Sequence, residues 1–97
     1  MSHSIHPEAE AEFEAAAGFY NEREEGLGDD LYEEVFATID RIIRDPNAWP
    51  QYSHRARRCL CNRFPYSVIY RYSKDAVTIY AIAHQSRKPG YWKDRLP

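Results

Sequence analysis

Apolar and polar residues alternate along the second half of the chain. Runs rich in β-branched, aromatic and thiol side chains cover residues 57–63, 66–73 and 76–84, and this composition is typical of β-strands. Only residues 64–65 and 74–75 separate the runs. Connections this short join neighbouring antiparallel strands, so the pattern predicts a three-stranded β-meander.

The first half shows the spacing of amphipathic helices. After Pro7, which suits a first helical turn, apolar side chains recur at helical intervals up to Tyr20. A second helix is expected to begin at Asp29 or Asp30, because Asp is a favoured N-cap, and to end at residues 45–46. Its apolar positions are Leu31, Val35, Ile39 and Ile42. The short glycine-containing link predicts an antiparallel helical hairpin.

Two further stretches complete the expected fold. Residues 2–6 are short and suit an edge strand, and residues 47–54 are expected to form a loop whose Trp49 and Tyr52 plug one end of the core. We therefore predict an α+β fold over residues 1–97 as a single domain. In it, a helical hairpin packs on one face of a small antiparallel sheet, in the order β-α-α-β-β-β.

The alternation also divides the sheet into two faces. The row predicted to face the helices contains Cys59, Cys61, Val68 and Tyr70, continued on the third strand by Val77, Ile79, Ala81 and Ala83. The opposite row contains Arg58, Asn62, Ser67 and Arg71. We expect this second face to be open, because helices are predicted to cover only one side of the sheet.

Charge is distributed unevenly along the chain. Residues 1–50 carry three Arg against thirteen Asp or Glu, a net charge of −10, whereas residues 51–97 carry ten Lys or Arg against two Asp, a net charge of +8. A cationic face would suit nucleic acid or an acidic protein partner. Alternatively, the acidic helices only neutralise the basic sheet.

Several site classes are not expected. Cys59 and Cys61 lack the spacing of a CxxC pair and are interpreted as reduced core residues. The four histidines show no metal-ligand spacing, so neither a metal nor a cofactor is predicted. No apolar run is long enough to span a bilayer, and the polar start lacks the core of a signal peptide. We therefore expect a cytoplasmic protein.

The candidate chemistry lies near the C-terminal end. His84 has the right ordinary pKa for a general acid or base, Arg58 and Arg87 are candidate phosphate clamps, and Tyr91 is a candidate auxiliary donor. The alternative for His84 is a structural one, in which its ring ties the C-terminal segment to the sheet. Candidate partner-binding residues are Arg58, Asn62, Ser67, Arg71, Arg87, Lys88, Tyr91 and Trp92. The alternative for Trp92 is that it covers the core or the sheet edge.

The order of these segments resembles a known family. Helix, glycine-containing turn, helix, "RFPYSVIYR" and "AIAHQSRKPGYW" together are similar to the RelE/ParE superfamily of bacterial type II toxin-antitoxin toxins, often labelled plasmid stabilisation proteins. The resemblance extends over about residues 8–92. Its most specific parts are "EREEGLGDDL", residues 63–71 and residues 84–92.

The resemblance implies a toxin that a cognate antitoxin neutralises. It also implies one of two targets, namely messenger RNA on the ribosome for RelE-type members or DNA gyrase for ParE-type members. RelE-type ribonucleases place several cations on the open sheet face, but Leu60 and Ser67 occupy two of those positions here, leaving Arg58.

We therefore expect a ParE-like toxin that inhibits gyrase by binding rather than an enzyme. One alternative is a ribosome-dependent mRNA endoribonuclease, or mRNA interferase, that uses Arg58, His84, Arg87 and Tyr91. Another is a non-toxic family member that only binds its antitoxin. The sequence does not decide between a homodimer and a hetero-oligomer with the antitoxin.

Overall fold

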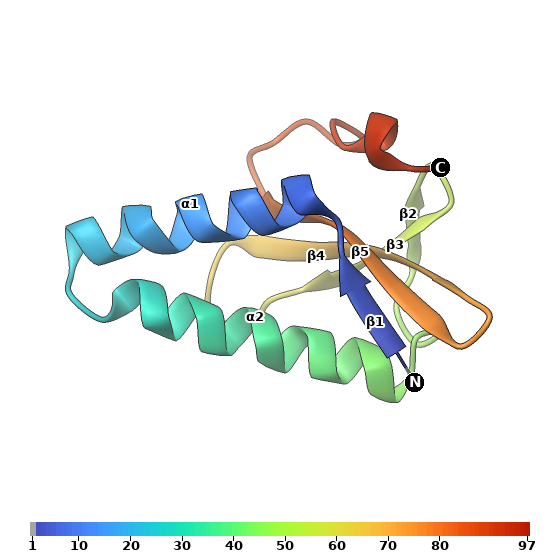
Figure 1. Cartoon of the computed structure of the whole chain (residues 1–97), viewed down its shortest axis with the longest axis horizontal. Helices are drawn as coiled ribbons and strands as arrows, with labels where there is room; N and C mark the ends of the chain where they lie inside the picture. The colour runs from blue at the N-terminus through green and yellow to red at the C-terminus, as the bar shows by residue number, and fades with distance from the viewer. Residues whose placement is uncertain (1) are drawn as a thin grey trace.

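A computed structural model describes residues 2–97 of the chain. Figure 1 shows the order of the elements. They are β1 (Ser2–Ile5), α1 (Pro7–Arg23), α2 (Leu27–Arg44), β2 (Gln51–Ser53), β3 (Ala56–Leu60), β4 (Tyr66–Ser73), β5 (Ala76–His84) and the short 3-10 helix η1 (Lys93–Arg95). The predicted α+β fold is confirmed, with a helical hairpin followed by a β-meander.

The sheet is mixed and has five strands in the order β1-β5-β4-β3-β2. Strands β3, β4 and β5 form the predicted antiparallel meander. The predicted edge strand β1 pairs in parallel with β5, at the opposite edge of the sheet from β2. Strand β2 pairs with β3 inside the stretch predicted as a loop. Strand β1 therefore departs from the predicted antiparallel sheet, whereas β2 extends the sheet in the antiparallel sense.

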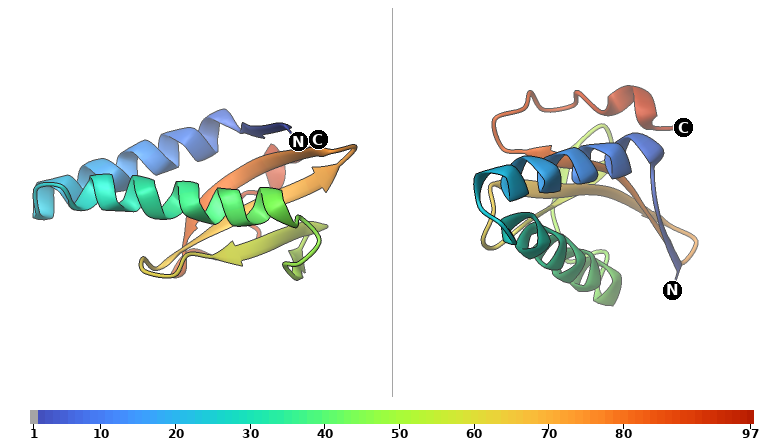
Figure 2. Two further views of the ribbon diagram at one scale, coloured as in Figure 1. Left: turned by 90° about the horizontal axis from the view of Figure 1, so that it is seen from below. Right: turned by 60° about the vertical axis from the view of Figure 1, so that its left-hand side comes forward.

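Both helices lie on one face of the sheet (Figure 2). Helix α1 begins as expected, with Pro7 in its first turn and the His6 ring accepting a hydrogen bond from the Glu8 backbone N–H. The main core lies between the hairpin and the sheet, and includes Phe13, Leu31, Val35, Ile39, Val68 and Tyr70. Cys59 and Cys61 belong to this core as free thiols, and burial raises the pKa of both.

Helix α2 begins earlier than predicted. Its N-cap is Gly26, with φ of 88°, a conformation that side chains disfavour. Asp29 and Asp30 lie within the first turn, where a carboxylate faces the positive end of the helix dipole. The Asn21 side chain of α1 accepts a hydrogen bond from the Gly28 backbone N–H at 2.8 Å. An asparagine of the preceding helix therefore satisfies one of the first-turn N–H groups of α2, and neither Asp serves as the N-cap.

Gly28 also lies where α2 packs tightly against α1. A Cβ atom at this position would collide with the Ala17 carbonyl oxygen and with the Asn21 side chain. We expect Gly28→Ala to lower the free energy of unfolding by about 1–3 kcal/mol, because overpacking outweighs the higher helix propensity of Ala. Urea denaturation would measure it. Gly18→Ala is the control, since nothing lies within 4 Å of its Cβ position, and it should be neutral or stabilising.

Strand β3 ends three residues before the predicted end. After Leu60 the chain bends away from the sheet, and the Glu34 carboxylate accepts the backbone N–H groups of Asn62 and Arg63 at 3.1 Å each. A side chain of α2 thus replaces the strand partner at these two positions. Asn62 consequently lies in an exposed turn and not on the sheet face where it was predicted.

A β-bulge divides β5 into two halves. Tyr70 pairs with Ile79 and Ile69 pairs with Ala81, so Tyr80 is an extra residue on β5. The side-chain alternation shifts by one position there. Val77 and Ile79 face the helices as predicted, but Ala81 and Ala83 belong to a second cluster on the reverse face. The prediction of one continuous row is wrong beyond the bulge.

The chain's own C-terminal segment covers the middle of the reverse face. After β5, the segment folds back so that Trp92 packs with Ile69, Ala81 and Ala83, and Tyr52 packs against the same cluster. Trp92 is only 1% exposed. The prediction of an open reverse face is therefore wrong at its centre, whereas the interpretation of Trp92 as a covering residue is confirmed.

The buried Tyr70 side chain makes the stability of the fold depend on pH in the alkaline range. Tyr70 is fully buried and donates a hydrogen bond to the Pro46 carbonyl at 2.6 Å, and burial raises its pKa to about 12. Since the unfolded-state pKa is about 10, the neutral phenol stabilises the fold below pH 10, and this contribution is lost as pH rises toward 12. We expect Tyr70 to contribute roughly 2 kcal/mol to that loss.

Urea midpoints between pH 9 and 12 would measure the effect. In Tyr70→Phe, stability should fall less steeply across this window, even though the variant starts from a lower stability after losing its hydrogen bond. Equal slopes in the two proteins would contradict the assignment.

Candidate functional site

A small hollow opens on the reverse face beside the end of β5. Its volume is about 30 Å³, and its lining includes seven of the residues predicted for the site: Arg58, Ser67, His84, Arg87, Lys88, Tyr91 and Trp92. The structure therefore gathers residues from β3, β4, β5 and the C-terminal segment at one place. Two predicted residues, Asn62 and Arg71, lie outside this hollow.

Two arginines beside the hollow are stacked on tyrosines. The Arg58 guanidinium lies 4.1 Å from the centre of the Tyr52 ring, and the Arg87 guanidinium lies 3.8 Å from the centre of the Tyr91 ring. A ring beneath a guanidinium holds it through cation–π attraction and leaves the N–H donors at its edge free. Both arginines are thus oriented without an ion-pair partner among residues 2–97.

His84 is engaged in the turn that follows β5. Its Nδ1 atom accepts a hydrogen bond from the Ser86 backbone N–H at 3.0 Å and lies 2.8 Å from Ser86 Oγ. Its ring also packs edge-on against Tyr66. The ring thus ties the start of the C-terminal segment to the sheet, but through its nitrogen as an acceptor and not as a donor.

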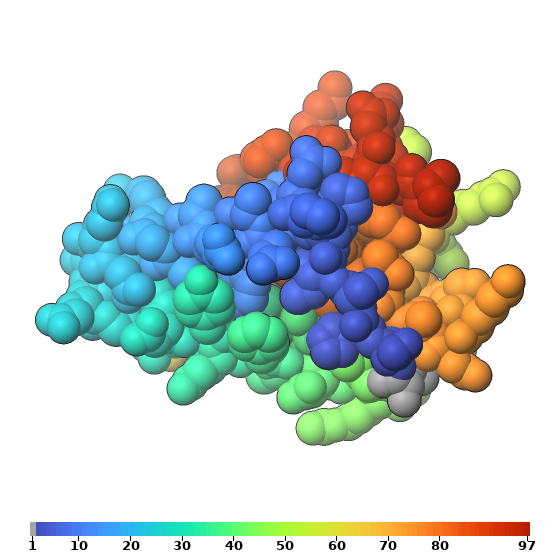
Figure 3. Space-filling view, in the orientation of Figure 1, coloured from blue at the N-terminus to red at the C-terminus, as the bar shows by residue number. Residues whose placement is uncertain are grey.

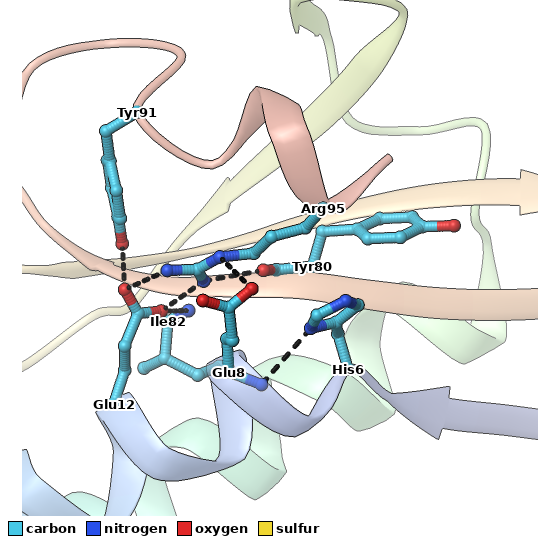
Figure 4. A network of polar contacts seen from close by, with 7 residues as sticks. All are labelled: His6, Glu8, Glu12, Tyr80, Ile82, Tyr91 and Arg95. Carbon is cyan, nitrogen blue, oxygen red and sulfur yellow. Dashed lines mark hydrogen bonds and ion pairs between the residues drawn. The ribbon is translucent and has the colours of Figure 1, made fainter. Parts of the chain in front are cut away.

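A polar network fixes the rest of the C-terminal segment to α1 (Figure 4). The Glu12 carboxylate accepts hydrogen bonds from Tyr91 Oη at 2.6 Å and from Arg95 Nη1 and Nη2 at 2.8 and 3.0 Å. It also accepts the Ile82 backbone N–H, while Arg95 donates to the Tyr80 carbonyl. Figure 3 shows the C-terminal residues packed against the first turns of α1. Glu12 is therefore the anchor of this segment.

The same network sets the protonation of its members. Burial and the hydrogen bond to the Glu12 carboxylate both raise the pKa of Tyr91, so its hydroxyl remains a neutral donor. The hydrogen bond to Glu12 also raises the pKa of Arg95. The Tyr91 hydroxyl therefore stays a neutral donor and Arg95 stays a cation throughout the neutral pH range.

Comparison with known proteins places this fold in a family. A family model described as the ParE toxin of type II toxin-antitoxin system, parDE, matches residues 4–89. The chain belongs to the ParE toxin family. A solved structure titled "Chromosomal ParDE TA system from P. aeruginosa" contains a chain that aligns with a TM-score of 0.76 and 16% identity, covering 87% of this chain and 95% of that one. No curated protein sequence matches.

Two of the predicted partner contacts are buried in this ParE-family chain. Ser67 and Trp92 face the hollow but are almost fully enclosed, so neither presents a surface to a partner in this conformation. Tyr91 is half-buried, and its hydroxyl is already bonded to Glu12. The exposed part of the predicted set is Asn62, Arg87 and Lys88.

Sequence reasoning missed three residues that shape this ParE-family site. Glu12 and Arg95 anchor the segment that carries Arg87, and Tyr52 orients Arg58. Glu12 stands in a run with Glu8, Glu10 and Glu14, and nothing in that run distinguishes it.

The described part of the chain offers no other obvious chemistry. Within residues 2–97 no group of three His, Cys, Asp or Glu side chains is arranged to hold a metal ion. Neither helix combines the length and the apolar composition that crossing a bilayer would need.

Proposed function

We propose that this chain is the toxin of a type II toxin-antitoxin pair, that a cognate antitoxin neutralises it, and that it acts by binding DNA gyrase. Membership of the ParE toxin family supports the toxin role. The likeness to a chain from a structure titled as a ParDE system supports an antitoxin partner. The gyrase target follows from the resemblance to ParE-type members of the superfamily.

The composition of the reverse face favours binding of a target protein over cleavage of RNA. A ribonuclease site must hold a phosphate between cations and bring an acid or base to it. Here Leu60 and Ser67 occupy two positions where RelE-type enzymes carry cations, and Trp92 fills the floor. The hollow of about 30 Å³ is roughly a tenth of a small ligand pocket.

Ribosome-dependent mRNA cleavage is the second candidate, because His84, Arg58, Arg87 and Tyr91 do line one hollow. One contact weighs against it. The Tyr91 hydroxyl is used by Glu12, and a ribonuclease would have to break this contact to release the hydroxyl as a donor. The Ser86 contact occupies only the Nδ1 atom of His84.

The deciding experiment is expression without the antitoxin, followed by scoring DNA damage against translation arrest. The proposal expects induction of the DNA-damage response and inhibition of gyrase supercoiling by the purified chain. Ribosome-dependent cleavage of mRNA, with supercoiling unaffected, would show that the target is mRNA on the ribosome and not gyrase. Absence of both effects, together with retained binding to the antitoxin, would identify a non-toxic family member.

Point variants separate binding from chemistry. Because binding does not need a proton donor or acceptor, His84→Gln is expected to keep toxicity within about threefold, whereas a general acid or base contributes roughly 10²–10⁴-fold. The double variant Arg58→Gln/Arg87→Gln is expected to lower toxicity tenfold or more, since a buried interfacial charge pair costs about 2 kcal/mol or more to break. Growth arrest at matched expression is the measurement.

The matched control is Arg23→Gln/Arg44→Gln, which removes the same charge from exposed helix positions. Loss of toxicity in His84→Gln alone would contradict the binding mechanism.

A further inference from the structure

Cations continue beyond the candidate hollow along the same side of the molecule. A second hollow of about 210 Å³ shares Lys88 and Tyr91 with the first, and a third of about 400 Å³ shares His54 and Lys93 with the second. The three hollows are therefore neighbours on the surface. We call their cations the basic track: Arg55, Arg58, Arg71, Arg87, Lys88 and Lys93.

The charge of the basic track is not compensated by the chain itself. No Asp or Glu of residues 2–97 lines any of the three hollows, although Asp94 follows Lys93 in sequence. The ion pairs within the described chain involve Arg63 and Arg95, neither of which belongs to the track. The acidic first half of the chain thus leaves this surface positive.

Arg71 is held in the track without losing its charge. Its Nη2 atom donates to the His54 carbonyl at 2.7 Å, which fixes the guanidinium without neutralising it. Arg71, Arg55 and Lys93 line the same hollow, so an oxyanion bound there would meet three cations.

We propose that the basic track binds the phosphate backbone of duplex DNA. A row of cations across adjacent hollows matches a linear polyanion, whose phosphates repeat along the strand. Contacts to phosphates alone position a protein on DNA without reading its sequence. This inference goes beyond gyrase as the target, because the track would hold DNA whether or not an enzyme also holds it.

The side chains of the track favour duplex DNA over a single strand or a protein. Single-strand binding relies on exposed aromatic faces for base stacking, but Arg58 and Arg87 cover the Tyr52 and Tyr91 rings and Trp92 is buried. Beyond the first hollow, where Arg58 and Arg87 are proposed to contact gyrase, the track lacks the apolar centre of a protein interface. The large exposed apolar side chains of the described chain are Phe19, Phe36 and Leu60, and none of them lines the second or third hollow.

Fluorescence anisotropy with a labelled duplex of about 20 bp and mixed sequence tests the proposal on the full chain. Contact with four or five phosphates predicts that affinity falls by roughly 10²–10³ between 50 and 200 mM salt. The variant Arg55→Asn/Lys93→Gln changes two exposed cations outside the first hollow, and Asn tolerates the φ of 62° at residue 55. It should bind more weakly at every sequence and reduce the salt slope by about two.

The control Arg23→Gln/Arg44→Gln should leave affinity and slope unchanged. Equal weakening by this control, or no binding to duplex at 50 mM salt, would overturn the proposal. Tighter binding of a single strand of the same length, or of a poly-glutamate peptide, would assign the track to those ligands instead. Because no gyrase is present, the result is independent of the supercoiling assay.

Discussion

Replacing Glu12 by Ala is expected to lower the free energy of unfolding by about 3–5 kcal/mol. The Glu12 side chain is 18% exposed and accepts four hydrogen bonds, two of them from the Arg95 guanidinium, which is 12% exposed. Removing one partner of an enclosed ion pair leaves Arg95 with only the exposed contact to Glu8, and that is the source of the large cost. The Tyr91 hydroxyl and the Ile82 N–H would also lose their acceptor.

Urea denaturation at neutral pH provides the measurement, with the midpoint expected to fall and the slope to stay constant. Glu8→Ala is the matched control, since Glu8 lies on the same helix and contacts Arg95 at 3.7 Å but is 66% exposed. An exposed pair of this kind contributes about 0–1 kcal/mol. A similar cost for the two variants would show that the network does not anchor the segment.

The Glu12 network also connects stability to the proposed site. Tyr91 is fixed by Glu12 at its hydroxyl and supports Arg87 on its ring. A variant that keeps the fold but loosens the segment, such as Glu12→Gln, should therefore weaken DNA binding without removing any charge from the basic track. A carboxylate of α1 therefore helps to position a cation of the basic track, although α1 supplies no residue of the track itself.

The elements with strong periodicity were predictable from sequence. Helix α2 carries Leu31, Val35, Ile39 and Ile42 at regular helical intervals, and these four side chains are buried. The three strands of the meander follow from alternation and from two short turns, and both the strand order and the helix-side row of Cys59, Val68 and Tyr70 are confirmed. In these elements local pattern and tertiary packing favour the same structure.

The remaining features depend on contacts between residues far apart in sequence. The bulge at Tyr80 reverses the facing of Ala81 and Ala83, and the local alternation continues through it without interruption. Strand β2 is three residues long and exists only because β3 offers a free edge. The end of β3 is decided by Glu34, which is 28 residues away from Asn62.

In the candidate site, too, some features follow from the local sequence pattern and others depend on contacts between distant residues. Clustering of Arg58, His84 and Arg87 followed from strand register and from the position of the C-terminal segment. Burial of Ser67 did not, because it requires the segment to fold back over the reverse face. The basic track was visible only as an excess of positive charge in residues 51–97. Its course depends on how three hollows share their lining residues.

Replacing Trp92 by Ala should be as damaging as the loss of Glu12, with an expected cost of about 3–5 kcal/mol. Large-to-small substitutions of a buried aromatic residue lose the transfer free energy of the ring and leave a cavity. Trp92 is the largest of the fully buried side chains, and it packs on the second cluster with Ile69, Ala81 and Ala83. Its loss would expose that cluster on the reverse face.

Two controls separate this cavity effect from a general sensitivity to the loss of apolar side chains. Trp92→Phe retains a ring and should recover part of the stability, whereas Leu60→Ala removes a side chain that is 47% exposed and should cost less than about 1 kcal/mol. Urea midpoints measure all three. Binding of a hydrophobic dye to Trp92→Ala under native conditions would show that the reverse face has opened. A midpoint unchanged from the parent protein would mean that the C-terminal segment does not contribute to the core.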